Sequence, residues 1–177
     1  MTSDLYTGSG DDGSTGLADG SRVTKDSARI DTIGSVDELN ALLGLVASQE
    51  AAAGEREMLY QIQHRLFDLG AELAAPGTAR LDAGDTGHLE GEIDRLDALV
   101  PPLRHFILPG GTGTSAMAHL ARTVCRRAER QLFLLSRTEA VNAHSLVFLN
   151  RLSDLLFALA RVLVHQASGT EIAWRPK

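Results

Sequence analysis

The sequence predicts an all-α fold, an up-and-down bundle of five helices preceded by an extended glycine-rich arm. Five segments repeat apolar residues at helical spacing, and only short connections join them. Aromatic residues make up 5% of the chain while alanine and leucine are abundant, which favours helix over sheet. The 177 residues suit one domain, which we divide into an arm (1–29), a helical bundle (30–168) and a tail (169–177).

Most of the expected helices have an apolar face or a recognisable end. The helices are expected at residues 31–49, 55–75, 88–100, 114–136 and 139–167. Pro76-Gly77 ends the second helix and Pro101 ends the third, because proline cannot continue a helix. Leucines line one side of the fifth helix. Residues 1–29 have almost no periodicity and are rich in Gly, Ser, Thr and Asp, which indicates an irregular arm.

The bulk composition excludes several classes of protein. A net charge of −6 and a pI near 5.5 argue against nonspecific binding to nucleic acid or to anionic membranes. No apolar run approaches the roughly 20 residues of a membrane span, and no secretory signal is evident. The single cysteine, Cys125, excludes an intrachain disulfide, and we expect a buried thiol rather than a nucleophile. A reducing, cytoplasmic setting is therefore expected.

Four arginines lie within nine residues of the expected fourth helix: Arg122, Arg126, Arg127 and Arg130. On a helix the first, second and fourth of these fall within an arc of about 80°, apart from the apolar face. Such a cluster in an acidic chain indicates a focused anion site. The alternative is a solvated face whose arginines pair with Glu129 and its neighbours.

The arm carries glycines that resemble a nucleotide-binding loop. Gly8, Gly10 and Gly13 match the spacing of the dinucleotide fingerprint, but no strand precedes them and no helix follows, so that interpretation fails. Glycines still permit concave backbone turns that bind phosphate oxygens, and Lys25 follows as a charge partner. The alternative is a disordered tail.

Other polar residues are less specific. Asp37 lies near the start of the first helix, where a carboxylate is favourable in any case. Asn150 and Asp154 are four residues apart on the fifth helix and face away from its leucines, so facing solvent is the alternative to a binding role. The histidines and the cysteine lack the spacing of zinc or di-iron sites, so we expect no metal ligand on the protein.

Six segments, in this order, give the chain a family resemblance: Thr-Gly-x-Gly-Asp-x-Gly-x-Thr (7–15), Val-Thr-Lys-Asp (23–26), Val-Asp-Glu-Leu-Asn (36–40), Phe-Ile-Leu-Pro-Gly-Gly (106–111), Ala-Arg-Thr-Val-Cys-Arg-Arg-Ala-Glu-Arg (121–130) and Asn-Arg-Leu-Ser-Asp-Leu-Leu-Phe (150–157). The sequence resembles the PduO-type ATP:cob(I)alamin adenosyltransferases over residues 6–161. The resemblance implies a homotrimer of five-helix bundles with ATP bound between adjacent subunits.

The resemblance also implies an activity. Members transfer the 5′-deoxyadenosyl group of ATP to the cobalt of cob(I)alamin, which forms adenosylcobalamin and releases triphosphate. ATP and cobalamin are then substrates, Mg²⁺ accompanies the phosphates, and a reductase and an adenosylcobalamin-dependent client enzyme are expected partners. The alternatives are a non-catalytic bundle that carries or senses nucleotide or cobalamin, and a different ATP-using transferase.

The family's roles are carried over to matching residues. The resemblance implies nucleotide contacts from Thr7, Gly8, Ser9, Gly10, Thr15, Gly16, Lys25, Arg126, Arg127, Glu129, Arg130 and Asn150. At Gly8 the chain departs from the family, where a basic residue is common. The resemblance assigns the catalytic roles to Arg126, Phe106, Arg122 and Asp37.

Each catalytic residue has its own expected role. Arg126 contacts the triphosphate, and Arg122 pairs with Asp37 across the subunit boundary. Phe106 lies against the corrin ring and leaves no room for a lower axial ligand. The alternative for Phe106 is a place in the core.

Overall fold

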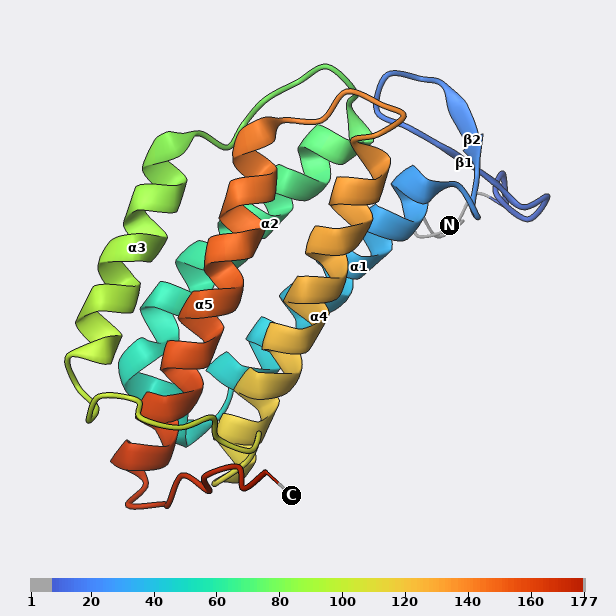
Figure 1. The fold of residues 1–177 in the computed structure, drawn as a ribbon. Coiled ribbons are helices and arrows are strands. Elements are labelled where there is room, and N and C mark those ends of the chain that lie inside the picture. Colours follow the sequence, from blue (N-terminus) through green and yellow to red (C-terminus); the bar gives the residue numbers. More distant parts are fainter. Residues whose placement is uncertain (1–7, 177) are drawn as a thin grey trace.

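The computed structural model describes residues 8–176 and consists mainly of five long helices that run alternately up and down (Figure 1). This confirms the predicted five-helix bundle. In chain order the elements are β1 (Ser14–Gly16), β2 (Arg22–Thr24), α1 (Ala28–Ala47), the 3-10 helix η1 (Glu50–Glu55), α2 (Arg56–Ala74), α3 (Ala83–Asp97), α4 (Gly113–Leu135) and α5 (Ala143–Gln166).

Helix α4 packs against both α1 and α5, while α2 packs on α1 and α3 packs on α5. Hydrogen bonds from side chains near both ends of α4 also join it to these two neighbours. Gln131 donates a hydrogen bond to Asp31 on α1 at 2.5 Å, and the Ser115 hydroxyl donates to the Ala160 carbonyl on α5 at 2.9 Å. The core between the helices is mainly leucine, and each fully buried leucine contributes about 2 kcal/mol. This arrangement fixes the position of α4 against its two neighbours and leaves its other face outward.

Helix α3 begins at Ala83, five residues before the predicted start at His88. Asp82 caps it, because its carboxylate accepts hydrogen bonds from the backbone N–H groups of Gly84 at 2.7 Å and Asp85 at 3.3 Å. The Asp85 carboxylate accepts in return from the Asp82 N–H at 2.9 Å. This reciprocal capping starts the helix with polar residues, which apolar periodicity cannot reveal.

Helix α5 begins at Ala143 rather than at the predicted Glu139. The Asn142 side chain caps it by accepting a hydrogen bond from the His144 N–H at 3.0 Å. An asparagine cap satisfies one of the N–H groups that the first turn leaves without a helical partner. Residues 139–142 therefore belong to the connection from α4.

The arm is a small hairpin rather than wholly irregular. β1 pairs antiparallel with β2, with Thr15 opposite Val23, and the Ala18 N–H donates to the carbonyl of Ala74 at the end of α2 at 2.8 Å. Gly13 has a φ of +84°, which glycine adopts at little cost just before the first strand. The hairpin lies beside the start of α1 (Figure 1).

At the opposite end of the bundle, the connector of residues 98–112 and the tail lie side by side (Figure 1). Ile107 and Ala173 form an isolated antiparallel bridge, and Leu108 N–H donates to the Ile172 carbonyl at 2.8 Å. Gly111 has a φ of +92°, and a Cβ there would lie 2.7 Å from a methyl carbon of Val164. The Pro-Gly-Gly sequence thus lets the connector pass close to α5.

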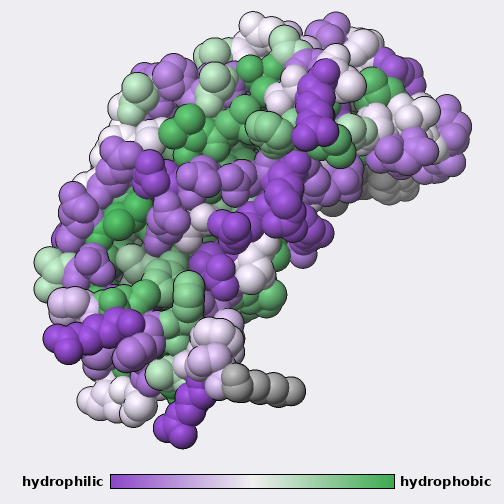
Figure 2. Space-filling view, in the orientation of Figure 1, coloured by the Kyte–Doolittle hydropathy of each residue, from purple (hydrophilic) through white to green (hydrophobic). Residues whose placement is uncertain are grey.

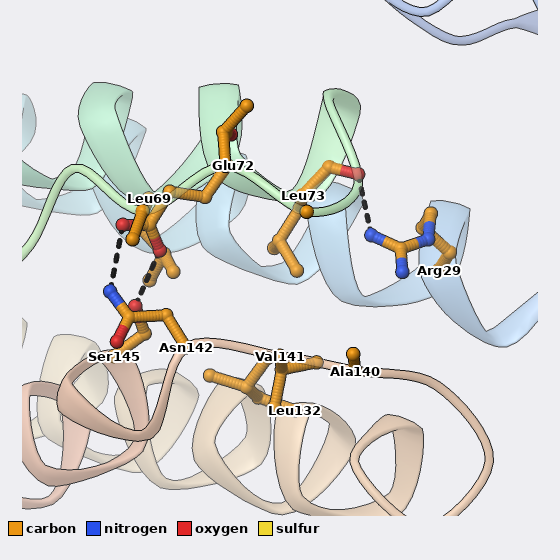
Figure 3. Close-up of a pocket in the computed structure, with 12 residues that line it drawn as sticks. Arg29, Leu69, Glu72, Leu73, Leu132, Ala140, Val141, Asn142 and Ser145 are labelled. Carbon is orange, nitrogen blue, oxygen red and sulfur yellow. Dashed lines mark hydrogen bonds between the residues drawn. The ribbon is translucent and has the colours of Figure 1, made fainter.

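A pocket of about 210 Å³ lies at the end of the bundle near the hairpin. Figure 3 shows the side chains that line it, with hydrogen bonds joining Glu72 to Asn142 and Ser145. Buried Glu72 accepts hydrogen bonds from the Asn142 side chain at 2.9 Å, the Ser145 hydroxyl at 2.6 Å and the Leu81 N–H at 2.7 Å. Burial alone would raise the pKa of Glu72, but these bonds and one from the Arg80 N–H lower it overall. The network joins α2 to the start of α5.

Candidate functional site

The connector and the outward face of α4 enclose a cleft of about 480 Å³. Phe106 and Ile107 come from the connector, Arg122 and Arg126 from α4, and Phe157 from α5. Three of the four residues predicted to be catalytic therefore line one cleft: Phe106, Arg122 and Arg126. Figure 2 shows strongly hydrophilic side chains gathered along the exposed side of α4, with hydrophobic patches beside them.

Phe106 stands out of the core at the mouth of this cleft. Its side chain is 77% exposed, so the alternative that it fills the core is wrong. The ring meets Trp174 of the tail edge to face, with ring centroids 6.3 Å apart and an angle of 77° between the planes. The backbone supports the same contact, because Trp174 N–H donates to the Phe106 carbonyl at 2.7 Å. An exposed aromatic pair is suited to packing on a flat apolar ligand.

Arg122 is partly buried, and one of its hydrogen-bond donors is unsatisfied. Its Nε is buried and has no hydrogen-bond partner among residues 8–176. Burial, and the nearby charge of Arg126, lower the pKa of its guanidinium. Leaving a buried donor unsatisfied is costly, so a ligand or another protein chain would stabilise this residue.

His119 lies in the lining of the same cleft and was not singled out from the sequence. It is 3% exposed, its ring packs edge to face on Phe157 with centroids 6.0 Å apart, and its Nδ1 has no partner among the described residues. Burial, reinforced by the charge of Arg122, lowers the pKa of His119, so its imidazole is neutral at pH 7. A neutral ring keeps further positive charge out of the cleft.

A second hollow, of about 520 Å³, adjoins the first at Arg126. Its lining includes Glu129, Arg130 and Phe133. Neither Arg126 nor Arg130 has a carboxylate within 4 Å in the chain from residue 8 to residue 176, whereas Glu129 accepts a hydrogen bond from the Asn150 side chain at 2.9 Å. The predicted alternative is a solvated face whose arginines pair with Glu129 and its neighbours. Arg126 and Arg130 are exposed as it expects, but among residues 8–176 neither is paired with Glu129. Two guanidinium groups are therefore available to an anion.

Arg127 faces the other way. It forms an ion pair with Glu38 on α1, and it lines neither hollow. The predicted arc of Arg122, Arg126 and Arg130 is thus found on one face of α4, while the adjacent arginine fastens α4 to α1. Nucleotide contact by Arg127 stays a prediction.

In the arm, Lys25 lies over the glycine turn. The backbone N–H of Lys25 donates to the Gly13 carbonyl at 2.9 Å. The side-chain Nζ of Lys25 lies close to Gly10, since a Cβ on that glycine would be 3.3 Å from it. Arg22, which no motif in the sequence singles out, donates to the Ser9 carbonyl at 2.6 Å and to the Ser14 hydroxyl. Two cations therefore gather at this turn.

The remaining arm residues take different positions. Thr15 and Gly16 belong to β1, Gly8 is exposed before the turn, and Thr7 lies outside the described residues. Their contacts with nucleotide stay predictions.

Asp37 is exposed on a different side of the molecule from Arg122. It lines a groove of about 380 Å³ between α1 and α2, beside Ile33 and the 70% exposed Phe67. The structure therefore does not join Asp37 to Arg122 within one chain. Their pairing stays a prediction about two chains.

The cysteine is structural. Cys125 is fully buried, and its thiol donates to the Leu149 carbonyl at 3.2 Å. Burial, with the nearby charge of Glu129, raises the pKa of the thiol, which keeps it protonated at pH 7. The predicted buried thiol is confirmed.

Two features of residues 8–176 bear on other classes of function. No group of three or more His, Cys, Asp or Glu side chains in that part of the chain could hold a metal ion. Over the same residues, no helix combines the length and the apolar character that crossing a membrane requires.

A family model described as cobalamin adenosyltransferase matches residues 5–163. The chain belongs to this family. Similar relatives include a cobalamin adenosyltransferase of Cupriavidus metallidurans, 49% identical over 98% of this chain and 95% of the relative. A corrinoid adenosyltransferase of Bacillus subtilis is 43% identical over 93% of this chain and 88% of that relative.

Solved structures of the family have the same fold. A phenylalanine-to-histidine variant of a PduO-type ATP:corrinoid adenosyltransferase from Lactobacillus reuteri, complexed with cobalamin and ATP, has a TM-score of 0.93. It is 36% identical, and the match covers 97% of each chain. An arginine-to-lysine variant complexed with ATP has a TM-score of 0.92, with 38% identity over 97% of this chain and 100% of that chain.

Proposed function

We propose that this chain transfers the 5′-deoxyadenosyl group of ATP to the cobalt of cob(I)alamin, forming adenosylcobalamin and releasing triphosphate. The observation that carries the proposal is the position of Arg126. It lines both the cleft that holds Phe106 and the hollow that holds Arg130. The Arg126 guanidinium can therefore contact the leaving phosphates in the hollow and also lie next to a corrin ring bound in the cleft.

The arginines act on the leaving group. Negative charge builds on the 5′-oxygen as its bond to the 5′-carbon breaks, and the departing triphosphate carries several charges. Arg126 and Arg130 present planar sets of donors suited to phosphate oxygens. Donors placed where charge develops contribute about 3–4 kcal/mol each to lowering the barrier. Lys25, over the arm's glycine turn, adds a further cation, and we include Mg²⁺ bound to the phosphates.

Phe106 acts on the corrinoid. The cobalt of cob(I)alamin supplies the nucleophile, so the protein needs no activated side chain. An exposed aromatic ring against one face of the corrin would exclude water and a lower ligand from that face. The same exclusion makes the preceding reduction to cob(I)alamin easier. Neutral His119 and partly buried Arg122 line the walls of this cleft.

We infer a homotrimer whose active sites lie between subunits. The Arg122 Nε has no hydrogen-bond partner among residues 8–176, while Asp37 is exposed in a separate groove beside Phe67. A head-to-tail contact that brings the α1–α2 groove of one subunit to α4 of the next would pair these two charges. Head-to-tail contacts form a closed ring when each one turns the next subunit by a whole fraction of a circle, and a turn of one third gives a trimer.

Partners and setting complete the proposal. A reductase would supply cob(I)alamin and a client enzyme would receive the product. We place the enzyme in the cytoplasm, where thiols such as Cys125 stay reduced.

The direct test mixes protein, ATP, Mg²⁺, cobalamin and a reductant, then follows adenosylcobalamin by absorbance and triphosphate by anion-exchange chromatography. We expect one triphosphate for each adenosylcobalamin. Binding of both substrates without product would favour the non-catalytic carrier or sensor. Release of ADP or pyrophosphate in place of triphosphate would favour a different ATP-using transferase.

A further inference from the structure

One buried arginine joins the C-terminal tail to the bundle through its side chain. Arg161 on α5 is 3% exposed, and its Nε donates to a carboxylate oxygen of Glu171 at 2.8 Å. Its Nη2 donates to the carbonyl of Pro101 at 2.7 Å, and its Nη1 lies 3.5 Å from a carboxylate oxygen of Asp97. One guanidinium thus joins α5 to the end of α3, the connector and the tail.

The tail in turn contacts the part of the connector that includes Phe106. Three residues beyond Glu171, Trp174 N–H donates to the Phe106 carbonyl at 2.7 Å and its ring meets the Phe106 ring. Between them, Ile172 accepts from Leu108 N–H at 2.8 Å. Phe106 itself is 77% exposed, so its own side chain has few contacts with the core to fix it.

We propose that Arg161 and Glu171 are positioning residues for the corrinoid: their ion pair fixes the tail, and the tail fixes Phe106 in the cleft. This inference rests on the proposed function for its substrate. Arg161 also lines the cleft, but it does not line the second hollow, which Arg126 shares with Arg130. The pair should therefore affect the corrinoid and leave ATP binding unchanged.

The ion pair between Arg161 and Glu171 is largely shielded from solvent, which strengthens its hold on the tail. The Glu171 side chain is 18% exposed, and the Nε2 of His165 lies 3.8 Å from its carboxylate. A bidentate contact between a guanidinium and a carboxylate fixes direction as well as distance. Lysine cannot reproduce that geometry or reach Pro101 with the same donors.

The test compares Glu171→Gln with Glu55→Gln. Glu55 is a buried carboxylate paired with Arg95, and neither residue lines the cleft, so this control removes an ion pair of similar kind elsewhere. We expect Glu171→Gln to raise KM for cob(I)alamin about tenfold by misplacing Phe106, with KM for ATP within about twofold of the parent. Arg161→Lys should have the same effect.

Two spectroscopic readouts separate positioning from loss of stability. In the complex with ATP and cob(II)alamin, the four-coordinate fraction should fall in Glu171→Gln and stay at the parent's value in Glu55→Gln. Trp174 is the only tryptophan, so quenching of its fluorescence by acrylamide reports the tail without any substrate. Quenching should increase in Glu171→Gln and not in the control.

Each contrary outcome has a distinct meaning. Unchanged tryptophan quenching in Glu171→Gln would overturn the proposed fastening of the tail. Increased quenching with an unchanged KM for cob(I)alamin would overturn the positioning role. If the parent protein made no adenosylcobalamin, the proposed function and with it the positioning role would fail, while the quenching comparison would still decide whether the ion pair holds the tail.

Discussion

The Asn150 side chain donates a hydrogen bond to a carboxylate oxygen of Glu129 at 2.9 Å, across the contact between α5 and α4. Both residues were predicted to bind nucleotide, and the structure brings them together beside Arg126 and Arg130. The bond holds the carboxylate to α5. Glu129 is consequently not paired with either arginine, and both keep their charge available for phosphate.

Replacing Asn150 by alanine should therefore weaken ATP binding indirectly as well as directly. Without its hydrogen-bond donor, the Glu129 carboxylate is free to pair with Arg126 or Arg130 and to compete with phosphate. We expect the Kd for ATP, measured by titration calorimetry, to rise about tenfold. In the double variant Asn150→Ala, Glu129→Gln, part of the lost affinity should return. An ATP affinity that is unchanged in the single variant would contradict this role.

Arg126→Ala should lower the rate of adenosylation about 10²-fold at saturating ATP, because one donor to the developing charge is lost. Arg127→Ala is the matched comparison on the neighbouring residue, and its ion pair with Glu38 predicts a much smaller effect on rate. Light scattering should find both variants in the same oligomeric state as the parent. Near-normal turnover by Arg126→Ala would remove that residue from the triphosphate site.

Phe106→Ala should restore a five-coordinate cobalt spectrum in the complex with ATP and cob(II)alamin, because water or a lower ligand regains access to the corrin face. Tyr60→Ala is a control, since Tyr60 is an aromatic residue of α2 that is 45% exposed and does not line the cleft. Magnetic circular dichroism distinguishes the two coordination states. A four-coordinate signal that persists in Phe106→Ala would exclude Phe106 from this role.

The five helices could be predicted because apolar spacing and proline positions are local signals. The same spacing predicted that Arg122, Arg126 and Arg130 share a face of α4, as the two hollows confirm. The starts of α3 and α5 were wrong because polar caps at Asp82 and Asn142 decide them.

The contact between Phe106 and Trp174 could not be predicted, since it joins residues far apart in sequence through backbone pairing. His119 and Arg161 were missed for a related reason. Each lies on a helix, and only the folded structure shows that its neighbours are a cleft or a tail.

Glu72 should stabilise the folded state above about pH 4.5 and lose that effect as the pH falls. Its folded pKa lies below the ordinary value, so the unfolded chain takes up the proton first, and acid shifts the equilibrium towards unfolding. We expect Glu72→Gln to lower the free energy of unfolding at pH 7 by about 2 kcal/mol and to flatten its dependence on pH below 4.5. Urea denaturation across that pH range, with exposed Glu57→Gln as control, measures both effects. An equal loss of stability at every pH would contradict the account.

We propose that each site between subunits combines Lys25 from the arm of one chain with Arg126 of the next, and hybrid trimers test this proposal most directly. Lys25→Ala and Arg126→Ala chains carrying different tags are coexpressed, and trimers containing both are purified on the two tags. In a closed ring, each such trimer has one interface with an unaltered arm and an unaltered arginine, so we expect about one third of the parent activity. Each variant alone should have almost none. Hybrid trimers no more active than the separate variants would contradict the shared site.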